Sequence, residues 1–554
     1  MLSQTVKKPR HRIESDKAGS KSPISHRSLV LSVVIALTAI LYGACSRTPD
    51  DPKRYLPADS LIAVASEDLG AALRPVVRNA SKQAGINTLP DLSNLDGLKI
   101  AAAITGFEAR EIPADGNRSV LDLRPKVVAI IELNAWSWQV NSIIENGIGE
   151  LINQAYGGEA ELESYPKSDG QYYVWTARDG RRIMAFAAGG LVFIANDEAA
   201  LDKVLSVRSG SEQALSFNFA DAKGENREIV ARGIITEAGI AQISNILAIQ
   251  MAIGSVEDEE SKQFISAALP VIVRNSIKQV EWTAVDDGAG FEDRYRIVPE
   301  PKIGQVFAET LEAGKGEFRE LAKMIPADAA MITFYNLKDS RIAWRSILLS
   351  IQAVSDPVTA RLAPVFAKTL AEPYGIDDTE SFLAAAGNRI ASFRIDPEGE
   401  QVAVTGLAVD ETLLRRSIIK ELAETKNVEK IGSYTILRAE EYCYAAGDGG
   451  RFTAGDCAAV EKAVGAATAG GSLAGTDAER QIADVSRAAA VTFSTRKVDL
   501  AAILSLFGGR VPEGKSGVER IITTTNFESG GAKRSAKSDF GLIGWMLESG
   551  ENKE

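Results

Sequence analysis

LPADSLIAVASEDL, residues 56–69, and IPADAAMITFYNL, residues 325–337, are two versions of one pattern, and this repetition decides the expected fold. In each stretch Pro and Asp predict a turn, because proline fixes its own backbone torsion and Asp hydrogen-bonds nearby amides. A short apolar run follows, which is typical of a buried strand. We therefore expect the same turn-and-strand start twice, once near the beginning of the body and once near its middle.

Further matching pairs follow in the same order along the chain. VVAIIELNAWSWQVNSII, residues 127–144, corresponds to VAVTGLAVDETLLRRSII, residues 402–419. GLVFIANDEAALDKV, residues 190–204, corresponds to GRFTAGDCAAVEKA, residues 450–463. The offsets between partners drift by a few residues, as insertions in loops would cause. Collinear matches of this kind indicate an internal duplication.

The pattern within each copy predicts the fold class. Apolar runs separated by glycine-containing turns indicate hairpins, and Asp197 and Asp456 each precede a helical pattern that they would cap. Tight hairpins imply antiparallel pairing, and the amphipathic segments imply helices packed on one face of the sheet. We therefore expect an α+β fold of two homologous tandem modules, residues 55–305 and 315–548, each a mainly antiparallel sheet covered by helices. The length of 554 residues agrees with two domains.

Charge and histidine content exclude several classes of function. The chain has a formal net charge of −12, and its basic leader, residues 1–27, leaves the remainder still more acidic. An acidic body with no basic stripe is repelled by phosphate backbones, so nucleic acid is not an expected partner. Both histidines, His11 and His26, lie in the leader, which removes histidine-based catalysis and histidine-containing metal sites from the body.

An uncharged segment with the character of an export signal precedes the body. It is SLVLSVVIALTAILYGAC, residues 28–45, and it is short for a membrane-spanning helix, which needs about 20 residues. The basic leader would remain in the cytoplasm, so everything after the segment is expected outside the cytoplasm. Residues 46–54 are polar, contain proline and suit a tether between the membrane and the body.

The end of this segment, LYGAC, resembles the lipobox of bacterial lipoproteins. Gly43 and Ala44 match its small positions, and Cys45 matches the cysteine that is lipidated and becomes the mature N-terminus. Tyr42 departs from the pattern, because an aliphatic residue is usual there. The resemblance implies a signal peptide, a lipid anchor at Cys45 and a periplasmic location, and Ser46 favours the outer membrane. The alternative is an uncleaved signal anchor, which would also tether the body to a membrane.

The body also resembles an uncharacterised family of large bacterial envelope proteins that are built from such modules, a domain of unknown function. The shared motifs are the PAD turn before the first strand and the Asp-led helix after the hairpin, in both copies. They are short and structural, although the resemblance spans most of both copies. It implies an envelope protein with an internal repeat, and it implies no activity or cofactor.

Ser417 and Lys420 are the candidates for a catalytic pair. They fit the Ser-x-x-Lys of penicillin-interacting enzymes, and the later KSG at Lys515 loosely resembles the Lys-Thr-Gly of those enzymes. A pattern this short also arises by chance, and the first copy has Glu145 where a lysine would be required. A helix surface is the simpler interpretation, so we assign no catalytic residue.

Cys443 and Cys457 are a candidate disulfide, because thiols outside the cytoplasm can be oxidised. A turn centred between Asp448 and Gly449 would place Cys443 opposite Ala454, too far from Cys457 without a bulge. Pairing and non-pairing therefore both remain open. A disulfide here would be a structural staple, and the chain offers no set of soft ligands for a metal site.

Two apolar helical patterns could line a groove for a lipid or a partner helix. They are ISNILAIQMAIG, residues 243–254, and the stripe of Trp344, Ile347, Leu348 and Ile351. Core packing is the preferred interpretation, since a sheet needs such helices to cover it.

The sequence predicts a non-enzymatic, membrane-tethered envelope protein that acts as a binding or scaffolding component outside the cytoplasm. Its expected partners are the membrane, through the anchor, and an envelope protein or an apolar ligand. No cofactor, metal or nucleic acid is expected. The alternatives are a carrier of lipid or another apolar ligand, and a cell-wall or lipid hydrolase that uses Ser417 and Lys420.

Overall fold

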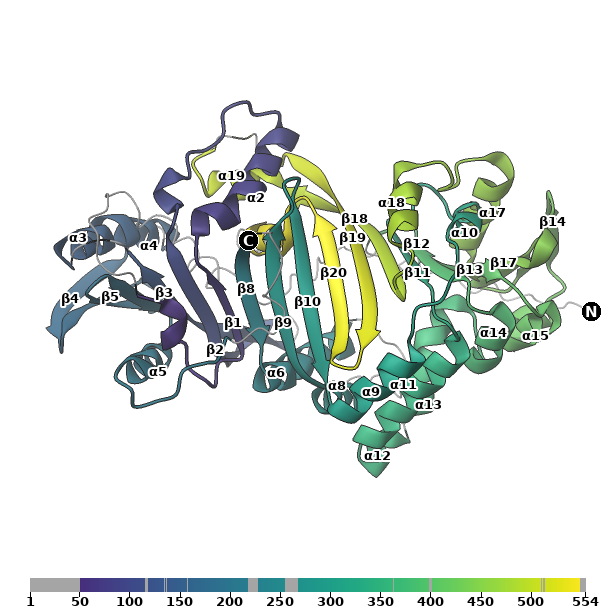
Figure 1. The fold of residues 1–554 in the computed structure, drawn as a ribbon, viewed down its shortest axis with the longest axis horizontal. Coiled ribbons are helices and arrows are strands. Elements are labelled where there is room, and N and C mark those ends of the chain that lie inside the picture. The colour runs from purple at the N-terminus through teal and green to yellow at the C-terminus, as the bar shows by residue number, and fades with distance from the viewer. Residues whose placement is uncertain are drawn as a thin grey trace, which may run out of the picture.

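The computed structural model describes residues 50–548 apart from residues 115–117, 134, 136, 157, 218–227, 255–267, 362, 398–400, 510 and 512–513. The described residues form an α+β fold in which helices flank an antiparallel sheet of 20 strands (Figure 1). This confirms the fold class predicted from the sequence. Within these residues no helix is both long and apolar enough to cross a bilayer.

The first half of the chain extends from the short helix η1 to helix α9. Its strands are β1 (Ile62–Ser66), β2 (Lys99–Ala114), β3 (Arg118–Glu132), β4 (Glu161–Lys167), β5 (Gly170–Thr176), β6 (Arg182–Ala188), β7 (Leu191–Ala195), β8 (Ile229–Ile235), β9 (Ile277–Asp286) and β10 (Phe291–Pro299). Its helices are η1 (Pro52–Tyr55), α2 (Leu69–Ala84), η2 (Ser93–Leu95), α3 (Ser137–Ser142), η3 (Ile143–Ile148), α4 (Gly149–Ala155), α5 (Glu198–Arg208), α6 (Glu237–Gly254), α8 (Leu269–Ser276) and α9 (Pro301–Thr310).

The second half extends from helix α10 to helix α20. Its strands are β11 (Met331–Tyr335), β12 (Ile390–Arg394), β13 (Val402–Leu407), β14 (Val428–Ile431), β15 (Tyr434–Arg438), β16 (Tyr442–Ala446), β17 (Arg451–Asp456), β18 (Ala490–Asp499), β19 (Ser516–Glu528) and β20 (Gly531–Ser538). Its helices are α10 (Arg319–Ala322), α11 (Ser340–Val354), α12 (Pro357–Ala360), α13 (Ala363–Ala371), η5 (Glu372–Tyr374), α14 (Thr379–Ala386), α15 (Glu411–Ser417), α16 (Lys420–Ala423), η6 (Asp448–Gly450), α17 (Cys457–Ala469), α18 (Asp477–Val485), α19 (Leu500–Ser505) and α20 (Gly541–Glu548).

The strands of the two halves are paired in the same order, and every pairing is antiparallel. In the first half the order is β4-β5-β6-β7-β3-β2-β1-β8-β9-β10. In the second half it is β14-β15-β16-β17-β13-β12-β11-β18-β19-β20. Hairpins supply most neighbours, and one long return brings β8 or β18 beside the first strand of its half.

The halves join edge to edge through β10 and β20, which pair from Phe291 opposite Ser538 to Ile297 opposite Ala532. Each half also packs its first long helix on the other half: α2 contacts α19 and α20, and α11 contacts α8 and α9. Asn79 of α2 fixes the first contact, because its amide donates to the backbone carbonyl of Asp539 at 2.7 Å. The two halves therefore share a core.

The predicted helix caps are confirmed. The Asp197 carboxylate accepts the backbone N–H of Ala200 at the start of α5, and Asp456 accepts that of Ala459 at the start of α17. A carboxylate in this position satisfies an amide that has no partner within the helix and interacts favourably with the helix dipole. Local chemistry therefore fixes where both helices begin.

Around strands β2 and β3 helices cover both faces of the sheet, which corrects the expectation of a single covered face. In the first half Ile100 and Ile131 belong to the core that includes α2, α3 and α4, whereas Ala101 and Ile130 belong to the core that includes α5. Successive strand residues point to opposite faces, so these two cores lie on opposite sides. The signal was present in the sequence, because consecutive apolar residues are typical of a strand that is buried on both faces.

Candidate functional site

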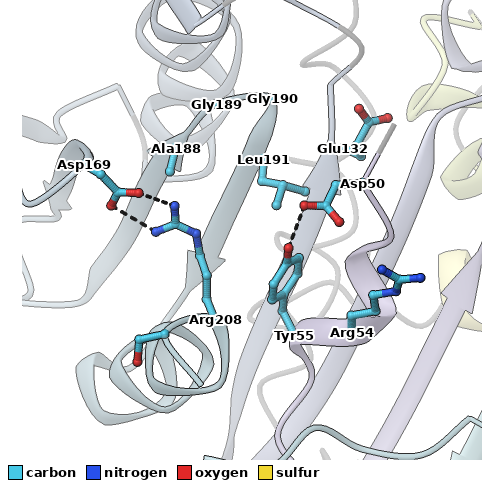
Figure 2. Close-up of a pocket in the computed structure, with 11 residues that line it drawn as sticks. Asp50, Arg54, Tyr55, Glu132, Asp169, Ala188, Gly189, Gly190, Leu191 and Arg208 are labelled. Carbon is cyan, nitrogen blue, oxygen red and sulfur yellow. Dashed lines mark hydrogen bonds and ion pairs between the residues drawn. The ribbon is translucent and has the colours of Figure 1, made fainter. Parts of the chain in front are cut away.

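A polar pocket of about 800 Å³ lies where the described chain enters the fold (Figure 2). Asp50 and Tyr55 reach the pocket from η1 and the residues just before it, Glu132 from the end of β3, and Arg208 from the end of α5. The turn between β6 and β7, which contains Gly189, completes its wall. The pocket therefore gathers polar groups at the end of the expected tether that joins the body.

Two pairs of side chains in this pocket are joined by hydrogen bonds. Arg208 forms an ion pair with Asp169 through two nitrogens, one of them 3.1 Å from its oxygen, and this pairing holds the pKa of Asp169 below its usual range. The Tyr55 hydroxyl donates to Asp50 at 2.6 Å, and burial together with this bond raises the pKa of Tyr55 to about 12. These bonds hold the Arg208 and Tyr55 side chains in fixed positions within the pocket.

The pocket carboxylate of Glu132 has no counterpart in the second half. Glu132 lies opposite Leu191 where β3 pairs with β7. At the corresponding end of the β13 and β17 pair, Leu407 lies opposite Arg451. The carboxylate of Glu132 is therefore a feature of the first half, in a pocket next to the first described residues.

A second polar site lies at the junction of the halves, around the buried side chain of Asp293 on β10. Its two carboxylate oxygens accept the Trp282 indole N–H and the Leu542 backbone N–H, each at 2.8 Å. Burial raises the pKa of Asp293 to about 6, and the two hydrogen bonds oppose that shift without cancelling it. Asp293 therefore links a strand of the first half to the start of α20 in the second.

We expect Asp293→Asn to change how stability depends on pH. The raised pKa means that folding favours the protonated acid, so the stability contributed by Asp293 is complete below its ordinary pKa and is lost as the pH rises through about 6. This loss amounts to about 3 kcal/mol for a shift of about two units. We expect the free energy of unfolding of wild type, measured with urea, to fall relative to that of the variant by about 2–3 kcal/mol between pH 4 and pH 7.

Asp378→Asn is the matched control of opposite sign. Asp378 caps α14 by accepting the backbone N–H of Ser381, and its hydrogen bonds lower its pKa. Its contribution is therefore present at neutral pH and is lost as the pH falls through the folded pKa. If the difference in free energy of unfolding between wild type and the Asp293 variant stays constant from pH 4 to 7, the pKa of Asp293 is not raised in the folded protein.

Glu519 on β19 is a second buried carboxylate at this junction, and its side chain is 1% exposed. It accepts the backbone N–H of Phe540 at 2.8 Å and pairs with Arg496 at 2.6 Å. Arg496 also pairs with Glu548 of α20 at 2.5 Å. One guanidinium on β18 therefore neutralises two acids that position the C-terminal helix.

An apolar groove of about 750 Å³ lies between α9 and α11. Ile303 and Val306 line it from α9, and Ile342 and Leu349 line it from α11. Leu349 is 63% exposed, which is unusual for a leucine on a helix that contacts several others. The groove could accommodate an apolar chain.

The predicted apolar stripe of α11 lies only partly in the core. Ile351 is buried, whereas Trp344, Ile347 and Leu348 are half-buried. In α6, the other predicted stripe, Leu247 is 51% exposed. Core packing, the preferred interpretation, therefore holds for one part of each helix, and the other part meets solvent.

The structure joins Cys443 and Cys457 in a disulfide with a Cα–Cα distance of 4.7 Å. The predicted register was wrong by one residue, because Cys443 lies opposite Gly455 and not Ala454. The turn is centred on Gly449, whose φ of 73° suits glycine, and is therefore one residue longer than expected. The bridge joins β16 to the first residue of α17, where it acts as a staple.

Cys45, the predicted lipidation site, lies outside the described residues. Ser417 is the last residue of α15 and is fully buried, and its hydroxyl donates to the carbonyl of Leu414 at 2.7 Å. Lys420 begins the separate helix α16 and is exposed. The Nζ atom of Lys515 donates to the carbonyl of Ala84. The structure thus places the serine and the lysines in different surroundings.

Sequence reasoning missed the acids at the junction of the halves. A signal for Asp293 does exist in FEDRYRI, residues 291–297, where Asp293 alternates with Phe291 and Tyr295 on one face of a strand. A carboxylate on an apolar strand face needs a partner when it is buried. Its partner, the N–H of Leu542, comes from the other end of the chain.

The described residues contain no group of three or more His, Cys, Asp or Glu that could hold a metal ion. No family model matches the sequence, and no curated protein matches it. A solved structure that does match is entitled "Structure of crystal form IV of TP0453", with a TM-score of 0.24 and 6% identity, over 47% of this chain and 85% of that chain. An overlap this low does not place the two chains in a common fold.

Proposed function

We propose that the chain is a membrane-tethered, extracytoplasmic component of the bacterial envelope, which binds or scaffolds a partner. It consists of two homologous modules, residues 55–305 and 315–548. The identical strand order of the halves supports the duplication, as do the caps of their first long helices, Asp68 for α2 and Asp339 for α11. The uncharged segment that ends in LYGAC supports the tether.

The observation that carries the binding role is the open sheet between the two modules. Strands β8, β9, β10, β20, β19 and β18 run across the middle of the molecule, and no helix lies in front of β8, β9, β10 and β20 in Figure 1. Side chains such as Lys533 and Lys537 of β20 stand exposed on these strands. The body thus offers a wide surface of regular structure.

The intact mass of the protein purified from its native membrane tests the tether. We expect a chain that begins at Cys45 and carries acyl groups, and we expect Cys45→Ala to retain its leader and lose the acyl mass. Ser46→Ala, next to the cysteine, should still be processed and is the matched control. A chain that is found in the cytoplasm, with neither acyl groups nor an anchored leader, would contradict the proposal.

The groove between α9 and α11 favours a second candidate, a carrier of lipid or another apolar ligand. Its exposed side chains Val306, Ile342 and Leu349 are the kind that bind acyl chains. Extraction of the protein purified in its native form distinguishes the two functions. A carrier would release lipid in fixed proportion to protein, and a scaffold would release only its own anchor.

A further inference from the structure

Basic side chains gather on one face of the open central sheet. Arg232, Thr283, Arg294 and Ser535 are direct partners in one row across β8, β9, β10 and β20. Direct antiparallel partners point to the same side of a sheet. We call this side of strands β8, β9, β10, β20, β19 and β18 the basic face, and Arg296 lies on it in the next row, two residues after Arg294.

The helices that cover the central strands near the junction lie on the opposite face. The N–H of Leu542 at the start of α20 bonds to Asp293, and Asp293 points away from its neighbour Arg294. Phe307 of α9 packs its ring against Phe527, the neighbour of Asn526, which points to the basic face. Both helices therefore leave the basic face open, and Figure 1 shows no helix in front of β8, β9, β10 and β20. Helix α18 covers the other end of the face, where Val491 and Phe493 of β18 are buried.

Three glutamates on the basic face form ion pairs with some of its arginine and lysine side chains. The pairs are Glu292 with Arg294 at 3.1 Å, Glu281 with Arg296 at 3.6 Å, and Glu528 with Lys533 at 2.9 Å. Glu281 and Glu292 are only 8% exposed, so these acids lie beneath the longer basic side chains. The exposed charge of this face is therefore mainly positive.

Three exposed cations on the basic face lie outside these pairs, namely Lys497 of β18, Arg520 of β19 and Lys537 of β20. Alternation along each strand places them on the side of Thr524 and Ser535. The chain as a whole carries −12, so this face has the opposite charge to the molecule. The expectation that no basic stripe exists is therefore wrong.

The tether leaves the body on the same side of the sheet. Leu56, directly after η1, is buried in the core that contains Ile234, and Ile234 shares its strand face with Arg232. η1 contacts β2 and β3, and only β1 separates β2 from β8. At about 4.8 Å per strand, the tether therefore begins about 10–15 Å from the edge of the basic face.

The tether is also short. Four residues lie between Cys45 and Asp50, the first described residue, and the five steps from one Cα to the next can span at most about 18 Å. A lipid anchor at Cys45 would therefore hold this side of the body close to the bilayer. Opposite charges attract strongly at such separations, because the screening length at physiological salt is about 8 Å.

We propose that the basic face binds the anionic phospholipid head groups of the membrane that holds the tether. This inference rests on the tether proposed above and names the partner of the open sheet. The membrane is favoured over an acidic protein because the anchor presents the head groups to this side of the body at high local concentration. Binding would lay the central sheet along the bilayer and fix the orientation of both modules.

Reactivity of lysines in the anchored full-length protein tests the proposal. The protein is reconstituted through its own anchor into vesicles of phosphatidylcholine, with or without phosphatidylglycerol, and amine acylation is followed by peptide mass spectrometry. We expect Lys497 and Lys533 to react about fivefold more slowly on anionic than on neutral vesicles, which corresponds to about 1 kcal/mol for a basic residue near an anionic surface. Lys420 and Lys426, on the far part of the second half, should react equally on both.

Charge-reversal variants supply the control. Arg520→Glu with Lys537→Glu should abolish the slowing at Lys497, and Arg416→Glu with Lys430→Glu, the same change in charge at exposed positions elsewhere, should leave it intact. Molar salt should also remove the slowing, since it shortens the screening length to about 3 Å. Both variants keep the buried residues, and their thermal unfolding verifies that they are folded.

Each remaining outcome is decisive. If Lys497 and Lys533 react equally slowly on neutral and on anionic vesicles, the proposal is overturned, because head-group charge would not be the cause. No slowing on either would also overturn it, and would leave an acidic protein as the partner of the basic face. A protein that does not float with any vesicle would refute the tether itself, which separates that failure from a failure of the basic face.

Discussion

Arg496→Ala is expected to lower the free energy of unfolding by about 3–5 kcal/mol, which is the usual cost of leaving a buried charge without its partner. The guanidinium lies 2.6 Å from Glu519 and 2.5 Å from Glu548. The Glu519 side chain is 1% exposed, so its charge is poorly solvated once the cation is removed. Urea unfolding at pH 7, followed by circular dichroism, measures the change.

Two further variants show whether the cost comes from the orphaned acid. Arg480→Ala removes an exposed arginine that pairs with Asp477, and surface pairs of this kind contribute at most about 1 kcal/mol. Adding Glu519→Gln to Arg496→Ala should recover part of the lost stability, because the uncompensated charge disappears. A loss no larger than that of Arg480→Ala would mean that Glu519 is solvated.

Elements that depend on neighbouring residues could be predicted from the sequence. Asp197 and Asp456 mark the starts of helices because the capping bond reaches only three residues along the chain. The α+β class follows from apolar runs and turns for the same reason. The repeated turn at Pro57 and Pro326 is equally local, since each proline sets its own backbone torsion.

Features that join distant segments could not be predicted. Nothing in the sequence of β10 indicates that Phe291 will face Ser538, because any antiparallel edge would satisfy its backbone. The register at Cys443 failed for a smaller reason, since one extra turn residue at Gly449 shifts every pair beyond it. Glycine can adopt a positive φ but is not confined to it, so the glycines of this turn do not reveal its length in the sequence.

The basic face could also be predicted only in part. Arg294 and Arg296 alternate on β10, as do Lys533 and Lys537 on β20, and this spacing is visible in the sequence. The sequence does not show whether those strands lie side by side, because Lys533 comes 239 positions after Arg294 in the chain. The net charge of an acidic chain therefore does not reveal a basic face that forms from distant strands.

Phe540→Ala should cost about 3–5 kcal/mol and should loosen a helix from the other end of the chain. The Phe540 side chain is fully buried at the start of α20, in the core that contains Leu73 and Val76 of α2. Removing it leaves a cavity beneath α2, so amide exchange in residues 69–84 should accelerate along with exchange in α20. Hydrogen exchange read by peptide mass spectrometry reports both regions at once.

Phe382→Ala is the matched control, because Phe382 is also buried but belongs to a core formed within the second half alone. It should accelerate exchange around α14 while α2 stays protected under conditions where the chain remains folded. The contrast separates a shared core from two independent ones. If α2 keeps its protection in Phe540→Ala, α20 does not hold the halves together, and the pairing of β10 with β20 must carry the junction by itself.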